Sequence, residues 1–96
     1  MSLQDDIRKA QRIKEMYPKG TRIELISMDD PYAPIPPGTR GTVNFVDDIG
    51  TVFPKWDNDR SLGVVPGEDS FRKLTQEEIE AENQEQDENN GMSMNM

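Results

Sequence analysis

The residue types that most often carry out acid–base, nucleophilic or metal chemistry are largely missing from this sequence. It contains no histidine and no cysteine, which removes the commonest general base and the usual zinc ligands. Pairs of aspartates remain at 29/30, 47/48 and 57/59. Each pair lies in a stretch typical of turns, where Asp bonds to nearby backbone. We therefore expect no catalytic residue, no metal site and no cofactor, and a protein that is not an enzyme.

A binding surface is the more promising kind of site, and the stretch from Asp29 to Gly38 is its first candidate. Prolines at 31, 34, 36 and 37 fix φ and remove backbone donors, which favours a stiff, extended loop over a strand. An aromatic residue in such a loop is typical of a protein-binding surface. The resulting hypothesis is a non-enzymatic binding module for a protein partner. Its expected contact residues are Tyr32, Pro34, Pro37, Trp56, Asp57, Asn58 and Arg60.

Two other interpretations of the proline-rich loop remain open. In one, the prolines stiffen a loop that folds back on the domain, so that Tyr32 and Ile35 cover the core. In the other, the loop is itself a proline-rich ligand, because Pro34 and Pro37 have a spacing that proline-binding domains recognise. The sequence does not separate these alternatives from a binding surface.

Basic residues gather near the N-terminus and recur at two later positions, which leaves two further alternatives for the function. Such charges can bind phosphates, so one alternative is RNA or DNA binding. The other is the sequestration of a small nucleotide-like ligand in a basic pocket. The residues of the nucleic-acid alternative are Arg8, Lys9, Arg12, Lys14, Arg22 and Arg40.

The overall charge is negative but unevenly distributed. The 96 residues carry a net charge of −8, and 32% of them are hydrophobic. Residues 75–96 contain seven acidic residues and no basic one, whereas residues 1–22 contain six basic and three acidic residues. No apolar run approaches the roughly 18 residues of a membrane-spanning helix, and no signal peptide is recognisable. We therefore expect no membrane partner and a cytoplasmic location in a bacterial host cell.

Apolar periodicity divides the chain into four segments. Residues 1–17 show the spacing of an amphipathic helix, which Pro18 and Gly20 should end. Residues 20–74 alternate short apolar runs with turn residues, residues 75–83 predict a short helix, and residues 84–96 predict a disordered acidic tail. The apolar face of the first helix is Leu3, Ile7, Ala10, Ile13 and Tyr17.

Residues 20–74 predict a mainly β fold, a small five-stranded SH3-like barrel, because they are too few for two full sheets. The first helix should cover Ile26 and Met28, which lie opposite the core positions of the first strand. The expected strands are Thr21–Met28, Gly41–Val46, Thr51–Trp56, Ser61–Val65 and Phe71–Leu74. The expected core is Ile23, Leu25, Val43, Phe45, Val52, Trp56, Leu62, Val64 and Phe71.

The segment after the barrel has a clear helix-start signal. Thr75 and Glu78 match a capping box, and Leu74 and Ile79 have the spacing of a hydrophobic staple. The helix that follows has few apolar residues to bury, so it should fray.

Linked motifs in residues 17–74 are similar to those of a known family. They are YPKGTRIEL at 17–25, PPGTRGTV at 36–43, VDDIGT at 46–51, WDN at 56–58 and SLGV at 61–64. The chain resembles a domain-of-unknown-function family, number forty-three fourteen, of small proteins of phages, plasmids and conjugative elements. The resemblance implies a compact SH3-like β domain in an accessory protein of a mobile element, and it supplies no catalytic residue.

One position departs from the pattern of that family. The hairpin there usually reads Trp-Asp-Asn-Gly, whereas this chain has Asp59 in place of the glycine. Glycine suits the positive φ of such a turn, and Asp is less favourable there. Replacing Asp59 with Gly is therefore expected to raise the melting temperature.

Overall fold

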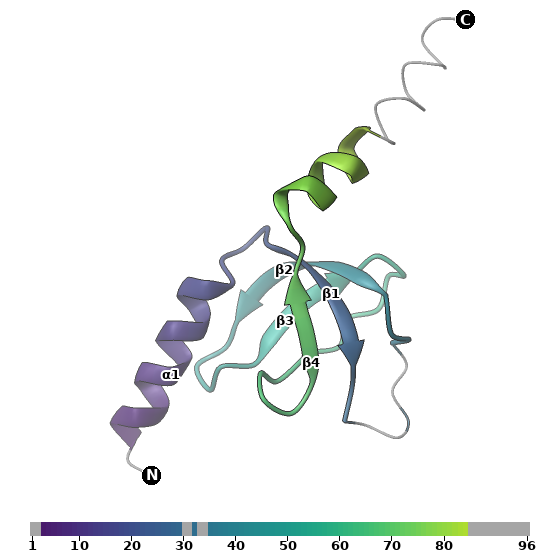
Figure 1. Ribbon diagram of the computed structural model, residues 1–96. Coiled ribbons are helices and arrows are strands. Elements are labelled where there is room, and N and C mark those ends of the chain that lie inside the picture. Colours follow the sequence, from purple (N-terminus) through teal and green to yellow (C-terminus); the bar gives the residue numbers. More distant parts are fainter. Residues whose placement is uncertain (1–2, 30–31, 33–34, 85–96) are drawn as a thin grey trace, which may run out of the picture.

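The computed structural model describes residues 3–29, 32 and 35–84 (Figure 1). The fold is mainly β with a helix at each end, and the C-terminal helix spans residues 76–84. The predicted acidic tail lies outside the described residues from position 85 onward. The named elements are helix α1 (Leu3–Met16) and strands β1 (Arg22–Ser27), β2 (Arg40–Val46), β3 (Val52–Trp56) and β4 (Ser70–Lys73).

Helix α1 lies beside the sheet (Figure 1) and packs on it through a narrow apolar stripe. Ala10 and Ile13 are buried, whereas Ile7 is 45% exposed. The apolar face of α1 therefore packs against the sheet only in part, and the covering of the sheet by this helix is less complete than predicted. The turn before β3 approaches the helix closely, since a Cβ at Gly50 would lie 2.9 Å from Ile13 Cδ1. The helix ends as predicted: the N–H of Tyr17 donates to the Ile13 carbonyl at 2.9 Å, and the chain then turns before β1.

The four strands form one antiparallel sheet in the order β3-β2-β1-β4. Alternation along the strands separates two faces. The inner face, toward the core, carries Ile23 and Leu25 of β1, which are 0% and 1% exposed. The outer face carries Arg22 and Glu24. Glu24 is the cross-strand neighbour of Arg40 on β2 and of Arg72 on β4.

The prediction of a five-stranded barrel is wrong for the part of the chain that the structure describes. The expected strand at 61–65 makes only one bridge, in which Val52 and Val64 exchange hydrogen bonds of 2.9 and 2.8 Å. The neighbouring positions cannot extend this ladder. Pro54 and Pro66 have no N–H to donate, and the Leu62 carbonyl accepts the indole N–H of Trp56 at 2.8 Å. The sheet therefore stays open, with β3 and β4 at its edges.

Two β-bulges accompany departures from the predicted core and from the predicted helix contact. The bulge in β2 falls between Val43 and Phe45, so Phe45 turns to the outer face, is 52% exposed and stacks on Phe53 with ring centroids 4.8 Å apart. Val46 packs against the core instead. The bulge in β1 falls between Leu25 and Ser27 and leaves Ile26 51% exposed, not covered by α1 as predicted. A single extra residue reverses which face the next side chain takes.

The core otherwise forms largely as predicted, with Trp56 at its centre. Gly41 allows the β2 backbone to lie against this ring, since a Cβ there would be 2.9 Å from Trp56 Cε3. Leu62 and Phe71 are only partly buried and pack at the edge. The proline-rich loop folds back far enough to bury Ile35, which is 1% exposed, while Tyr32 is 89% exposed. The buried cluster is Ile13, Ile23, Leu25, Ile35, Val43, Val52, Trp56 and Val64.

Within the described residues, no helix combines the length and the apolar character needed to cross a membrane.

Candidate functional site

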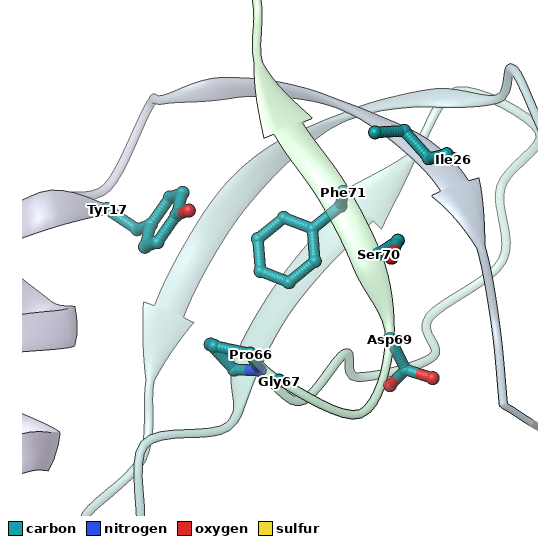
Figure 2. Close-up of a pocket in the computed structure, with 7 residues that line it drawn as sticks. All are labelled: Tyr17, Ile26, Pro66, Gly67, Asp69, Ser70 and Phe71. Carbon is teal, nitrogen blue, oxygen red and sulfur yellow. The ribbon is translucent and has the colours of Figure 1, made fainter.

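A pocket that contains aromatic rings and polar groups lies beside β4, at the edge of the sheet (Figure 2). Its volume is about 310 Å³. Four parts of the chain build it: the residue after α1, the end of β1, the turn that leads into β4, and the start of β4 itself. The lining residues are Tyr17, Ile26, Pro66, Gly67, Asp69, Ser70 and Phe71.

Two aromatic rings form one side of this Tyr17–Phe71 pocket. The ring centroids of Tyr17 and Phe71 lie 5.3 Å apart with the planes tilted by 50°, which is a favourable arrangement for an aromatic pair. Both rings are partly buried and pack against the core, and burial raises the pKa of Tyr17. Lys73 Nζ lies 5.2 Å from the Tyr17 ring centroid, so one of the two rings already has a cation over it.

The turn before β4 is held by the carboxylate of Asp69. One oxygen accepts a hydrogen bond from the Asp29 N–H at 2.9 Å, and the other accepts from the Val65 N–H at 2.9 Å. Gly67 has a φ of 95°, which suits glycine in a tight turn. Asp69 thus joins the turn that carries Pro66 to Asp29, two residues beyond the end of β1.

The pocket adjoins an edge strand. β4 pairs only with β1 in the described sheet. Edge strands present backbone N–H and C=O groups on which an added strand can pair. A pocket beside such an edge can hold one side chain of an extended peptide while the peptide backbone pairs with β4.

A second region, on the outer face of the sheet, is built entirely differently. Arg22 makes two bonds of 2.8 Å to the Asp57 carboxylate and bonds of 2.7 and 3.1 Å to Glu82 of the C-terminal helix. It also donates to the Thr42 hydroxyl at 3.1 Å. These two carboxylates raise the pKa of Arg22. Only 18% of its side chain remains exposed.

The other two arginines of this region share carboxylates with Arg22 and with each other. Glu24 accepts from Arg40 at 3.0 Å and from Arg72 at 3.3 Å. Glu78 accepts from Arg72 at 2.7 and 2.8 Å and from Arg40 at 3.4 Å. Glu82 accepts from Arg40 at 3.1 Å. Two carboxylates of the C-terminal helix therefore bridge three arginines on three adjacent strands.

The predicted capping box positions the first of these carboxylates. The Glu78 N–H donates to Thr75 Oγ1 at 3.1 Å, and Glu78 Oε1 accepts from the Thr75 N–H at 2.9 Å. Arg72 and then the Thr75 N–H lower the pKa of Glu78 to about 2, and Arg22 and Arg40 lower that of Glu82. The short helix was expected to fray for want of apolar contacts, but it is held on the sheet by ion pairs.

The residues predicted to contact a partner do not share one surface role. Trp56 is 0% exposed and belongs to the core. Asp57 is engaged with Arg22, and Asn58 accepts from the Arg60 N–H at 3.1 Å within the turn. Tyr32, Pro37 and Arg60 are exposed. Pro34 lies outside the described residues.

The structure also separates the six basic residues of the nucleic-acid alternative. Arg8, Lys9, Arg12 and Lys14 are exposed on α1, where Lys14 pairs with Asp48 at 2.9 Å. Arg22 and Arg40 belong to the ion-pair network and have no such exposure. The six residues therefore do not form one basic surface.

Sequence reasoning missed both regions described above. The four-residue spacing of Glu78 and Glu82 was a usable signal, because it places both carboxylates on one side of a helix. The Tyr17–Phe71 pair had no such signal, since 54 positions separate the two rings. No group of three acidic side chains within the described residues is placed to hold a metal ion.

Comparison with known proteins gives a family but no activity. No curated protein matches the chain. A family model described as "Domain of unknown function (DUF4314)" matches residues 6–74, which include α1 from Asp6 onward, all four strands and the Tyr17–Phe71 pocket. The match ends before the C-terminal helix. The chain therefore belongs to this family of unknown function, as its linked motifs predicted.

Proposed function

We propose that the protein is a non-enzymatic binding module that takes up an extended segment of a protein partner at the Tyr17–Phe71 pocket. The observation that carries this proposal is the pocket with two aromatic rings directly beside the edge strand β4. Aromatic anchors contribute most of the binding energy in many protein interfaces. The absence of histidine and cysteine supports a role in binding over one in catalysis.

The chemistry of the pocket defines the segment that it fits. An aliphatic or proline side chain can lie between Phe71 and Pro66 without leaving a polar group unpaired. The rim is charged at both ends, with Lys73 over Tyr17 and the exposed Glu68 beside the turn. A segment with an apolar anchor and a basic residue toward the turn is the best match. Its backbone pairs with the outer edge of β4.

The biological setting proposed here follows the sequence resemblance. On that basis the partner is a host or element protein in the bacterial cytoplasm, and the module is an accessory protein of a phage or other mobile element. The Tyr17–Phe71 pocket takes the place of the surface around Tyr32 and Trp56 as the proposed contact, since Trp56 is enclosed in the core.

Selection from a random peptide library on the full chain tests this function. Ile26→Glu places a charge at the pocket, and Ile49→Glu is the matched control, because Ile49 is 79% exposed in the turn before β3. Selected peptides should share an apolar anchor, bind the wild type and the control alike, and bind Ile26→Glu at least about tenfold more weakly. Amide shifts on binding should concentrate on residues 66–73.

Equal binding of the selected peptides to both variants would place the contact elsewhere and overturn the assignment of this pocket. Failure to select any peptide above background, with the chain folded by tryptophan fluorescence, would overturn the proposed function itself.

A further inference from the structure

The outer face of the sheet carries a second set of groups that the proposed function does not use. Phe45 and Phe53 stack at one end of the β2–β3 pair. At the other end, Arg22, Arg40 and Arg72 lie on three adjacent strands. The pocket proposed for a protein partner is built from other residues, so the two surfaces are independent.

Between the rings and the arginines lies a largely apolar hollow with two lysines in its lining. It has a volume of about 290 Å³, and Lys19, Thr42 and Lys55 are among its lining residues. Thr42 is the cross-strand neighbour of both Lys55 and Arg22, so the hollow continues directly into the arginine end. Aromatic rings followed by cations along one sheet face are the combination that binds single-stranded nucleic acid, with bases on the rings and phosphates on the cations.

The C-terminal helix covers the arginine end of this face. Its two inward carboxylates, Glu78 and Glu82, bond to all three arginines at 2.7–3.4 Å. Arginine recognises carboxylate and phosphate with the same two-pronged geometry. The helix therefore occupies these arginines in the way that the phosphates of a nucleic acid can.

The contact between the C-terminal helix and the sheet is of a kind that a competing anion can replace. Glu77, Glu80 and Ala81 are exposed, and Ile79 is only partly buried, so little apolar surface fixes the helix on the sheet. Ion pairs between partly exposed groups are weak and are screened by salt. A polyanion can replace these carboxylates without disturbing the core.

We propose that the outer face binds single-stranded nucleic acid and that the C-terminal helix, through Glu78 and Glu82, competes for its arginine end. Displacing the helix leaves Arg22, Arg40 and Arg72 with Glu24 and Asp57 as their remaining carboxylate partners, which is an excess of positive charge. The tethered helix acts at a high effective concentration, so binding by the intact chain is weak.

Two double variants of the full chain separate this competition from a simple change of net charge. Glu78→Gln with Glu82→Gln removes the bridging carboxylates, and Gln still supports the capping box. Glu77→Gln with Glu80→Gln removes the same charge from exposed positions of the same helix. Binding is followed by fluorescence anisotropy of labelled oligothymidylate and oligouridylate of about 15 nucleotides at about 50 mM salt.

The first double variant should bind at least about tenfold more tightly than the second, and raised salt should weaken its binding. Comparison of the two oligonucleotides shows whether DNA or RNA is preferred. Equal binding by the two double variants would overturn the competition, and no binding by either would overturn the nucleic-acid surface. Peptide binding by Ile26→Glu tests the Tyr17–Phe71 pocket, and its outcome does not affect the comparison of the two double variants.

A third comparison tests the aromatic end. Phe45→Ala, added to the Glu78→Gln and Glu82→Gln variant, should weaken binding several-fold because base stacking is lost. Ile49→Ala in the same background is the control, because that side chain is exposed in the turn beyond β2. Equal binding by these two variants would show that the rings take no part.

Discussion

Neighbouring residues of β4 serve two surfaces that are built on opposite principles. Phe71 belongs to the aromatic pair with Tyr17 that lines the pocket, whereas Arg72, the next residue, belongs to the ion-pair network with Glu24 and Glu78. The first surface is continuous with the core. The second is closed only by charges on the C-terminal helix.

The difference between these surfaces determines how each responds to solution conditions. Burial of an aromatic side chain contributes on the order of 1.5–3 kcal/mol and is insensitive to moderate salt. An exposed ion pair contributes about 0–1 kcal/mol and is screened as salt rises. The Tyr17–Phe71 pocket is therefore a permanent feature of the fold, and the cover over the arginines is a reversible one.

The largest effect on stability is expected when two adjacent residues of β1 are compared. Ile23→Ala leaves a cavity in the core, since Ile23 is 0% exposed, and should lower the free energy of unfolding by about 2–5 kcal/mol. Glu24→Gln weakens ion pairs on the outer face and should lower the free energy of unfolding by about 1 kcal/mol or less. Urea unfolding followed by Trp56 fluorescence measures both. Similar losses for the two variants would show that the outer face is as important for folding as the core.

Asp59→Gly should stabilise the protein without altering either surface. Asp59 has a φ of 67°, as its place in the family's hairpin predicted, and a non-glycine residue in that region is strained by up to about 1 kcal/mol. The melting temperature should rise by roughly 4–8 °C for each kcal/mol gained. Asn58→Gly is the control, and an unchanged or lower melting temperature for Asp59→Gly would contradict the strain.

Acid should loosen the outer face before it unfolds the core. The folded pKa of Glu78 is about 2, below its ordinary 4.5, because of Arg72 and the Thr75 N–H. The stability from its ionised form is thus fully present above pH 4.5 and is lost as the pH falls toward 2. Amide shifts of residues 76–84 should change over this window while those of the core residues Ile23 and Val52 do not.

Glu78→Gln provides the control for that titration, because it removes the titrating group. A simultaneous change of both regions on acidification, in the wild type and in this variant, would show that they are not independent.

The smallest effect is expected from removing residues 85–96. Among the described residues, the carboxylates that hold the C-terminal helix on the sheet are those of Glu78 and Glu82. A chain ending at Gln84 should melt within a degree or so of the full chain in thermal unfolding. A larger drop in melting temperature would show that residues after position 84 also stabilise the fold.

Local sequence signals predicted the elements but not how they meet. The apolar period of α1, the alternation in β1 and the capping box at Thr75 depend on neighbours in the chain, and each formed as predicted. The bulge before Phe45 and the single bridge at Val64 depend on pairing with distant strands. A shift of one residue there changed which face Phe45 occupies, and with it the candidate surfaces.

The sequence by itself determined four of the five expected strands, the two helices, most of the core and the lack of histidine and cysteine chemistry, because these follow from residue type and short-range periodicity. Only the tertiary structure decided that the sheet stays open, that Tyr17 meets Phe71, and that Glu78 and Glu82 cover three arginines. Those contacts join residues far apart in the chain, and they depend on strand register and on the path of the chain after β4, which no local pattern encodes.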